Sequence, residues 1–461
     1  MKEISNINEW LFINLDLIEE CKEKNIKPIV FIAGASSSGK SFLSKQLQLF
    51  LSNRDLKSII ISSDNYNNGL AKNIFDIVNE KYFNCEIINQ EKIIENIKNI
   101  IENSDFDKKF CKENLIKIKK TCEKFLNVDM STFLSKLSYE FDHINFDQKR
   151  IYNLQELSND LLILANNKSI TEKKYSKLTS ERISTNKTIC GKDFDVIIVE
   201  GIYALDDTIA SKVPSLNQIT NFVNCNNKHL FLRRIIRDSQ ITNCPIDFII
   251  KNYITYVSPE YLNNILSTKK NANIVLNNDM SFDELRQGKL STQARYRINN
   301  NTLKSLISNS KIIKRVYQED IYFGTKEDKD ILRLRLQGNI KNNLDLKSLI
   351  YKGQQKTRKD NNLIRPMQVL CEQEDLLKMY KNKTEIINDF KSIGVTEYQT
   401  LCKERIYIQY KDHKIKIDLY DNNRIYIELD DDSITFFNSS NKLEKVDPIV
   451  QMNSNIENDL Q

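Results

Sequence analysis

The feature that most constrains this chain is the segment GASSSGKS, residues 34–41, which matches the pattern G-x-x-x-x-G-K-[ST]. It contains two of only ten glycines in 461 residues. The preceding run "KPIVFIA" is apolar and β-branched, which predicts a buried strand. The following run "SFLSKQLQLFL" predicts a helix with an apolar stripe made of Phe42, Leu43, Leu47 and Leu51. A strand, this loop and a helix in that order favour a phosphate-binding loop over a Ser/Gly-rich surface loop.

The chemistry of such a loop explains its residue types. Glycine lets the backbone approach phosphate oxygens closely, so that successive amides at the helix N-terminus face the anion. Lys40 supplies a positive charge to the β- and γ-phosphates, and the Ser41 hydroxyl is a ligand for Mg²⁺. The residues expected to bind a nucleotide are Gly34, Ala35, Ser36, Ser37, Ser38, Gly39, Lys40 and Ser41.

Four more apolar runs predict a parallel sheet of about five strands alternating with helices. The run "LKSIIISSDNYN" leads to Asp64, and "FDVIIVEGIYAL" delivers Glu200 followed by Gly201; the others are "ITNFVNC" and "NANIVLNN". Ligands of open α/β sheets bind beyond the carboxyl ends of the strands, where both acids fall. An acid at a strand end can also cap the next helix. Two acids beside one phosphate loop favour Asp64 as a proton acceptor or metal ligand and Glu200 as a metal ligand.

Composition excludes several classes of protein. The 68 basic side chains stand against 62 acidic ones, a mixed surface that argues against a nucleic-acid partner. Nine scattered cysteines without a C-x-x-C pair, and no signal peptide, predict a reducing, cytoplasmic location. No apolar run reaches membrane-spanning length, so we expect a soluble protein without a membrane partner. The oligomeric state stays open, a homo-oligomer included.

A series of motifs resembles the uridine kinase and phosphoribulokinase family of P-loop kinases. In chain order these are GASSSGKS, SSDNY, YEFDHINFD, ITEKKYSKLTSERI, FDVIIVEGIYAL and LFLRRIIRDSQ, which runs on into IIKNYITYVSPEYLNNIL. They extend over residues 1–280. The resemblance implies an α/β P-loop NTPase fold. It also implies transfer of the γ-phosphoryl group of ATP, with Mg²⁺, to a hydroxyl of a uridine-like nucleoside, a sugar phosphate or a related small molecule.

The same resemblance assigns roles by position. It makes Asp64 the catalytic base, with Lys40 and Arg237 as further catalytic residues, and Arg237 also contacts the nucleotide. Substrate contacts are implied at Asp142, Tyr175, Arg234 and Asn252, the last where uridine kinases have a base-reading glutamine. Two positions depart from the family. The lid carries Thr242-Asn243-Cys244 instead of Arg-Gly-Arg, and Ser180 replaces a substrate-binding histidine. Lid arginines stabilise charge on the transferred group, so both uridine specificity and turnover are affected.

Residues 67–138 form an insertion that the family pattern lacks. Isoleucines recur at helical spacing in it, at Ile93, Ile94, Ile97, Ile100 and Ile101, and "LIKIKKTCEKFL" shows the same period. We predict a helical subdomain with solvated lysines, with substrate gating or partner binding as the alternative role.

From about residue 291 the pattern changes to strands with charged residues two apart, hence on one face. These residues are Arg333 and Arg335, Lys403 and Arg405, Lys414, Lys416 and Asp418, and Arg424, Tyr426, Glu428 and Asp430. One interpretation is a half-exposed antiparallel sheet whose charged face meets water. The other is an antiparallel β-barrel with an apolar outside covered by helices and a charged bore. Such a bore suits a polyphosphate held with a divalent metal.

The segments EDIYFGTKEDKDILRLR, LIYKGQQ and KERIYIQYKDHKIKIDLYDNNRIYIELD resemble CYTH domains, the triphosphate-tunnel metalloenzymes. The resemblance implies phosphate binding by Arg333, Arg335, Lys352, Lys403 and Arg405. It implies metal binding by Glu428 and Asp430, with Asp418 close by. The family's opening Glu-x-Glu-x-Lys is replaced by the segment 291–295, Ser-Thr-Gln-Ala-Arg, without either glutamate. Loss of two hard oxygen ligands weakens a Mg²⁺ site.

The predicted order is therefore a kinase-like domain (1–280), a linker (281–290), a CYTH-like domain (291–440) and a disordered tail (441–461). Three functions remain open. The first is an ATP-dependent phosphotransferase acting at the phosphate loop and Asp64. The second is a tri- or pyrophosphate hydrolase acting in the tunnel. The third is a sensor in which both sites bind and neither turns over.

Overall fold

A computed structural model describes residues 1–105, 108–241, 244–279, 289–354, 356–357, 363–421, 423–430 and 444–445. The chain divides into two compact units. Unit 1 contains Met1–Asn226 and Thr255–Asp279, and unit 2 contains Asn227–Ile254 and Met280–Gln461. Within the described residues, no helix combines the length and apolar composition that crossing a membrane requires.

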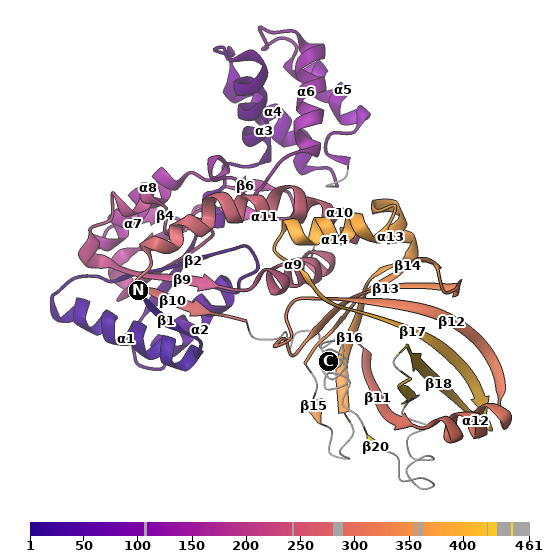
Figure 1. The fold of residues 1–461 in the computed structure, drawn as a ribbon. Coiled ribbons are helices and arrows are strands. Elements are labelled where there is room, and N and C mark those ends of the chain that lie inside the picture. The colour runs from indigo at the N-terminus through magenta and orange to yellow at the C-terminus, as the bar shows by residue number, and fades with distance from the viewer. Residues whose placement is uncertain are drawn as a thin grey trace. The chain divides into compact units, whose positions relative to one another are not determined.

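Unit 1 is built on a six-stranded parallel sheet of order β1-β10-β9-β2-β8-β3 (Figure 1). Its strands are β1 Lys2–Ile4, β10 Ile274–Asn277, β9 Gln218–Asn224, β2 Ile29–Gly34, β8 Val196–Glu200 and β3 Ser58–Ser62. The parallel sheet is confirmed, with one strand more than expected. The extra strand, β1, is a three-residue edge strand and too short to give an apolar run. Every residue of β2 and β8 is buried, as in sheets covered on both faces.

Helices of unit 1 outside the insertion are α1 Ile7–Glu23, α2 Lys40–Ser52, α7 Leu154–Ala165, α8 Asp207–Ala210 and α11 Ser258–Glu260. Leu43, Leu47 and Leu51 of α2 are fully buried in the core beneath the sheet. The expectation for Phe42 is wrong, because this side chain is 52% exposed. One residue turns a helix by about 100°, which places Phe42 beside the stripe and not in it.

Two short antiparallel strand pairs complete unit 1. The hairpin of β5 Lys174–Ser176 and β6 Glu181–Ile183 lies in the chain between β4 Ser169–Thr171 and β7 Thr188–Cys190, which pair with each other. Each pair is a separate two-stranded sheet. An isolated two-stranded pair is marginally stable, so both need contacts from elsewhere in the unit.

The insertion folds as the predicted helical subdomain, with α3 Leu70–Val78, α4 Gln90–Glu102, α5 Lys112–Cys122 and α6 Met130–Asp142 gathered in one bundle (Figure 1). Its own core includes Ile93, Ile97 and Ile101, all fully buried. The expectation of solvated lysines is wrong for Lys109, which has no exposed surface. Its amine is buried because the Thr179 carbonyl accepts a hydrogen bond from it.

Unit 2 carries a ten-stranded sheet of order β15-β16-β14-β13-β12-β17-β18-β19-β11-β20. The strands are β11 Lys289–Ile298, β12 Lys311–Phe323, β13 Ile331–Ile340, β14 Asn343–Lys352, β15 Lys356–Thr357, β16 Leu363–Glu372, β17 Glu397–Tyr410, β18 His413–Tyr420, β19 Ile425–Asp430 and β20 Glu444–Lys445. All their pairings are antiparallel, and β11 pairs with both β19 and β16. The pairing therefore runs from β11 through seven other strands and returns to β11, which makes a ring of eight. Strand β20 lies inside the predicted disordered tail, whose other residues lie outside the described ones.

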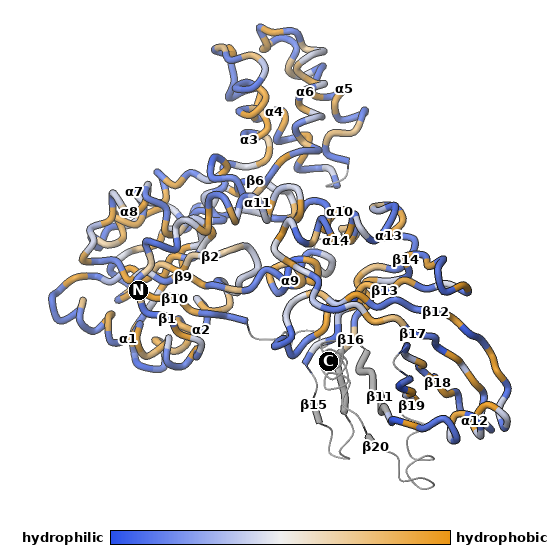
Figure 2. Tube along the Cα trace, viewed as in Figure 1, coloured by the Kyte–Doolittle hydropathy of each residue, from blue (hydrophilic) through white to orange (hydrophobic). Residues whose placement is uncertain are grey.

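The two faces of this sheet differ in chemistry, and Figure 2 shows hydrophilic and hydrophobic residues mixed along its strands. One face forms an apolar core with Ile406, Ile417 and Ile427, covered by Leu306 of helix α12 (Asn300–Ser308). The charged residues therefore share the opposite face, because side chains alternate along a strand. The remaining helices of unit 2 are α9 Asn227–Ile241, α10 Ile246–Asn252, α13 Gln373–Met379 and α14 Lys383–Ser392.

Helix α9 follows β9 in the chain but is built into unit 2. Its Phe231 ring lies 5.2 Å from Phe390 of α14. At its N-terminus, Lys228 donates to Asp330 at 2.6 Å, and the Tyr351 hydroxyl donates to the same carboxylate at 2.9 Å. Lys228 and Asp330 are each 3% exposed, so α9 is fixed by an apolar contact and a buried ion pair.

Candidate functional site

The predicted phosphate loop has the backbone that anion binding requires. Gly34 (φ 149°), Ser37 (φ 65°) and Gly39 (φ 101°) take conformations that most side chains disfavour. A Cβ at Gly34 would lie 2.5 Å from the Val223 carbonyl oxygen, so only glycine fits beside β9. Lys40 is buried, and its amine donates to the Ala35 carbonyl at 2.7 Å. The loop backbone therefore folds over the Lys40 side chain at the N-terminus of α2.

One polar atom of this loop fits a bound anion. The Ser37 hydroxyl oxygen is buried and has no hydrogen-bond partner within the described structure. Buried hydroxyl groups are normally hydrogen-bonded, because leaving one unpaired costs free energy. A phosphate oxygen at the N-terminus of α2 would accept from this group as well as from the backbone amides. The loop therefore suits the phosphates of a nucleotide.

The predicted metal ligands Ser41 and Glu200 lie in contact. The Ser41 hydroxyl donates to Glu200 Oε2 at 3.0 Å, and the Ser62 hydroxyl donates to Oε1 of the same carboxylate at 2.5 Å. A Cβ at Gly201 would lie 2.6 Å from the Ser63 Cβ, so glycine lets the ends of β8 and β3 approach. Hard oxygen atoms gathered in this way are the donors that Mg²⁺ prefers.

Asp64 lies just beyond the carboxyl end of β3, in the short helix η1 (Ser63–Tyr66). Its carboxylate pairs with the Lys177 amine at 3.0 Å. Lys177 comes from the β5–β6 hairpin, and the Tyr175 amide in the same hairpin donates to Asn65 at 3.2 Å. Burial raises the pKa of the Tyr175 phenol. The structure thus places Asp64 and Tyr175 on neighbouring segments, as a base and a substrate contact require.

The segment YEFDHINFD contains two aspartates in different environments. Asp142, the predicted substrate contact, is exposed at the end of α6. Asp147 is buried, and its carbonyl accepts from the Tyr203 hydroxyl at 2.9 Å. Burial raises the pKa of Tyr152, and the charges of Asp64 and Asp147 both add to the shift. Asp147 therefore lies in the same region as Asp64. The sequence prediction missed it, although residues 145–147 read Asn-Phe-Asp like the family's segment.

Arg234, Arg237 and Asn252 belong to unit 2, on α9 and at the end of α10. Arg234 pairs with Asp238, and Arg237 Nε donates to the same carboxylate at 2.7 Å. Burial acts to raise the pKa of Asp238, but the two arginines hold it below its ordinary value. The predicted lid departure at Thr242 and Asn243 lies outside the described residues.

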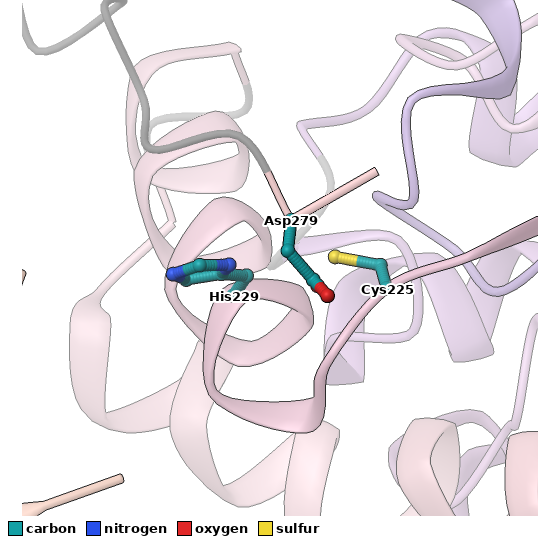
Figure 3. Close-up of side chains that lie close together, drawn as sticks. All are labelled: Cys225, His229 and Asp279. Carbon is teal, nitrogen blue, oxygen red and sulfur yellow. The ribbon is translucent and has the colours of Figure 1, made fainter. Parts of the chain in front are cut away.

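The remaining strands of the parallel sheet end in polar groups too. Cys225 follows β9 and Asp279 follows β10. Figure 3 draws both side chains, together with His229 from α9. The Asp279 carboxylate accepts from the Asn226 amide at 2.6 Å, and His229 Nε2 lies 2.9 Å from Asp330 Oδ2 within unit 2. Asp279 therefore stabilises the turn after β9.

In unit 2 three of the five predicted phosphate ligands converge on a carboxylate that the sequence prediction missed. Asp320 of β12 accepts two hydrogen bonds from Arg335, at 2.6 and 2.7 Å. The Lys403 amine lies 3.3 Å from it, and Arg333 Nε lies 3.7 Å from it. Burial acts to raise the pKa of Asp320, but Arg333 and the other cations hold it well below its ordinary value. The available signal was Gln318-x-Asp320, two polar residues on one face of a strand.

A second carboxylate pair completes the cluster. Arg405 donates to Asp418 at 2.6 and 2.7 Å and to Glu428 at 3.0 Å. The Lys416 amine donates to Glu428 at 3.3 Å. Glu428, predicted as a metal ligand, is thus paired with two cations. Arg333, Lys403, Arg405, Asp418 and Glu428 are all buried. For these five residues the interpretation of a charged face open to water is wrong, because neighbouring charges replace solvent there. Lys414 on the same strand as Asp418 is exposed.

The cluster has a surplus of positive charge. Among the described side chains, five cations share three carboxylates: the cations are Arg333, Arg335, Lys403, Arg405 and Lys416, and the carboxylates are Asp320, Asp418 and Glu428. Burial lowers the pKa of Lys403 to about 7, against the attraction of Asp418. Arg333 Nε is buried and has no hydrogen-bond partner within the described residues. Arg333 therefore contacts Asp320 only at ion-pair distance, and its Nε is available to donate a hydrogen bond to a further oxygen.

Three predicted groups take no part in this cluster as described. Lys352 is half-buried at the end of β14. Asp430 ends β19 and segment 291–295 lies in β11, but their side chains lie outside the described ones.

Comparison with known proteins gives a consistent result for the first half of the chain. A profile described as the phosphoribulokinase / uridine kinase family matches residues 102–283. Uridine kinase of Macrococcus caseolyticus is 32% identical over 154 residues, which are 33% of this chain and 69% of that protein. Uridine kinase of Staphylococcus aureus strain JH9 is 31% identical over 29% of this chain and 66% of its own. Uridine kinase of Ureaplasma parvum is 30% identical over a segment that makes up 28% of this chain and 61% of that protein.

Solved structures show a distant similarity. A possible uridine kinase from Bacillus stearothermophilus is 14% identical and covers 57% of this chain and 97% of its own, with a TM-score of 0.29. The YGR205w protein is 13% identical, and the match covers 59% of this chain and 94% of that protein, with a TM-score of 0.36. At these TM-scores the structural neighbours support no conclusion about function.

Proposed function

This chain belongs to the phosphoribulokinase/uridine kinase family, and we propose that it transfers the γ-phosphoryl group of ATP to a hydroxyl of a nucleoside or a related small molecule. The observation that carries the proposal is the junction of the phosphate loop with two strand ends. Ser41 and Ser62 bond to one carboxylate, Glu200, and Asp64 follows two residues after Ser62. Nucleotide, metal and proton-acceptor groups are thereby gathered at one sheet edge.

The residues fit the reaction as follows. The loop amides, Ser37 and Lys40 hold the phosphates of ATP. Ser41 and Glu200 would hold Mg²⁺, which neutralises charge on the phosphate oxygens. Asp64 accepts the proton of the acceptor hydroxyl as its oxygen bonds to the γ-phosphorus, and the bond to the bridging oxygen breaks, so that ADP leaves with the electron pair. Lys177 pairs with Asp64 at 3.0 Å and places a positive charge beside the proposed base.

Asp147 and Tyr175 are the acceptor-binding residues in this proposal. Asp147 is buried close to the Asp64 region, and Tyr175 is held beside Asn65 by its backbone amide. Asp142, Arg234 and Asn252 remain candidate substrate contacts from the family resemblance, and Arg237 remains the candidate nucleotide contact.

The test is a transfer assay with labelled ATP against a panel of nucleosides and sugar phosphates. Lys40→Ala should abolish transfer, whereas Lys45→Ala, an exposed lysine on the same helix, should leave it unchanged. Absence of transfer to every acceptor would refute the kinase. Tight ATP binding by the same protein, without turnover, would favour the sensor.

We also propose that unit 2 is a CYTH-like domain that binds a short polyphosphate. Two observations favour it. The strand pairing returns to β11, and the described cations of the cluster outnumber its carboxylates, with an Arg333 Nε that makes no hydrogen bond among the described residues. The three described carboxylates of the cluster are each paired with cations, and the opening glutamates of the CYTH pattern are absent. Both features favour binding over hydrolysis.

Calorimetry with inorganic tripolyphosphate tests the second proposal. Arg333→Ala should weaken binding by about tenfold or more, the free energy of a charge-assisted hydrogen bond. Arg315→Ala is the matched control and should leave binding unchanged. Arg315 lies on the exposed part of β12, where it pairs with Glu404 of β17. Magnesium-dependent release of phosphate that Arg333→Ala abolishes would establish the hydrolase instead.

A further inference from the structure

The helical insertion is joined to the acceptor side of the candidate active site by three buried contacts. The Leu70 amide at the start of α3 donates to the Ser180 carbonyl at 2.8 Å. The next amide, of Ala71, donates to Glu181 Oε1 at 2.6 Å. The Lys109 amine donates to the Thr179 carbonyl at 2.5 Å. All three acceptors lie in the turn and second strand of the β5–β6 hairpin.

The burial of these groups makes the contacts specific. Lys109 is fully buried and Glu181 is 2% exposed. A Cβ at Gly69, which has a φ of 92°, would lie 3.2 Å from the Glu181 carboxyl carbon, so glycine lets the carboxylate reach the head of α3. Helix α3 has no side-chain cap of its own. Glu181 therefore caps α3 from a distant part of the chain, which places a carboxylate where a helix N-terminus favours one.

Several charged groups of the insertion surround this carboxylate. Lys98 and Glu102 of α4, and Lys109, all act on it electrostatically. Burial raises the pKa of Glu181 to about 7 and lowers the pKa of Lys109 to about 8. Neither group is solvated, so each depends on the partner that the other segment supplies.

The same hairpin reaches the catalytic segment through its first strand and turn. Lys177 pairs with Asp64, and the Tyr175 amide bonds to Asn65. The Lys177 pair is largely exposed and weak by itself. Among the described residues, the hairpin pairs with no further strand. Arg182 of β6 also pairs with Glu156 of α7 at 2.7 Å, at a partly exposed site. The contacts with the insertion are more deeply buried, so they contribute most to the placement of the hairpin beside Asp64.

We propose that the insertion positions the acceptor-binding hairpin, and that Lys109 and Glu181 are positioning residues which set the affinity for the phosphoryl acceptor. This proposal rests on the proposed kinase function. Neither residue touches acceptor or nucleotide; each acts through Thr179, Ser180 and the start of α3. The insertion is thereby a specificity element, because its position determines how Tyr175 and Lys177 meet the acceptor.

The experiment combines hydrogen exchange and kinetics on the full chain. Lys109→Met should raise amide exchange in residues 174–183 by about tenfold or more, the loss expected for one buried charged hydrogen bond. The KM for the acceptor should rise by a similar factor, while the KM for ATP stays unchanged. Lys108→Met is the matched control, since its side chain is 68% exposed. It should change neither quantity.

A second pair of variants guards against misfolding. Glu181→Gln retains an oxygen that accepts from Ala71 and should behave nearly as the natural protein. Glu181→Ala should reproduce the Lys109→Met result. Unchanged exchange in the hairpin, or faster exchange with an unchanged acceptor KM, overturns the proposal. If the natural protein phosphorylates no acceptor, the kinase proposal fails, and exchange in the hairpin alone decides whether the insertion holds it.

Discussion

The two sheets of this molecule place their charged residues in opposite ways. Unit 1 has a parallel sheet whose β2 and β8 are buried throughout, and its carboxylates Glu200 and Asp64 lie at or just past the strand ends. Unit 2 has an antiparallel sheet with charged residues along one face, among them Asp320 and Arg405. In the first sheet both faces hold helices, so only the edge is free for chemistry. In the second, one face carries the core and the other carries the charges.

This difference predicts whether a carboxylate of each sheet can be substituted with a loss of function but no loss of stability. An edge carboxylate can be removed without disturbing the core. A carboxylate buried among cations cannot, because its neighbours are left unpaired.

The largest effect is expected for Asp64→Asn. Removing the proposed base should lower kcat by about 10²- to 10⁴-fold, the range for general base catalysis. The midpoint of thermal unfolding should stay within about 2 °C, because a half-exposed edge residue changes stability by a few tenths of a kcal/mol. Steady-state kinetics and calorimetry measure the two quantities. A large loss of stability would remove the contrast between the sheets.

Next in size is Asp320→Ala. It leaves Arg333, Arg335 and Lys403 without their shared carboxylate, which should destabilise unit 2 by about 3–5 kcal/mol. Urea unfolding measures the change. Glu319→Ala is the control on the same strand. Glu319 pairs with the partly exposed Lys383 and should cost about 1 kcal/mol or less. Equal effects of the two variants would show that the buried cluster is not structural.

In unit 1, a loss of stability comparable to that of Asp320→Ala is expected only when a buried apolar side chain is removed. Ile198 of β8 is fully buried, so Ile198→Ala should destabilise the protein by about 2–4 kcal/mol through lost burial and a cavity. Ile198→Val should cost about 1 kcal/mol, which gives a graded series. The measurement is again urea unfolding. An effect of Ile198→Ala near zero would mean that the parallel sheet does not depend on its apolar strands.

The smallest effect concerns pH. Because the pKa of Lys403 is lowered to about 7, this lysine is charged below that pH and neutral above it. Its attraction for a polyphosphate is therefore present at pH 6 and lost as the pH rises to 8. We expect affinity for tripolyphosphate to fall by up to about tenfold relative to Lys403→Met over this range, since one pKa unit corresponds to about 1.4 kcal/mol. Parallel pH profiles of the two proteins in calorimetry would contradict the assignment.

Much of unit 1 could be predicted because its signals are local. The phosphate loop with its flanking strand and helix, and the positions of Asp64 and Glu200, follow from apolar runs and short motifs. Strand β1 was missed because three residues are too few to show a hydrophobic pattern. Phe42 was wrongly assigned to the buried stripe because it directly precedes Leu43, and both residues are apolar.

The tertiary contacts could not be predicted in the same way. Lys109 looks like any surface lysine in a lysine-rich insertion, and its burial depends on a carbonyl 70 residues away. Asp320 looks like an ordinary strand residue until the arginines of β13 are paired beside it. The alternation of charge in unit 2 predicted a shared face but left open whether that face meets water. The burial of Lys403, Arg405 and Asp418 decides that point for these residues, and it follows from tertiary contacts.

The chain crosses between its two units three times, between residues 226 and 227, 254 and 255, and 279 and 280. A stop codon or a proteolytic cut near residue 280 would therefore not release an intact first half. Helix α9 would keep its apolar Phe231 and its buried Lys228 but lose Phe390 and Asp330, their partners. A chain cut there would therefore expose an aromatic side chain and leave a buried lysine without its carboxylate, at a cost in stability.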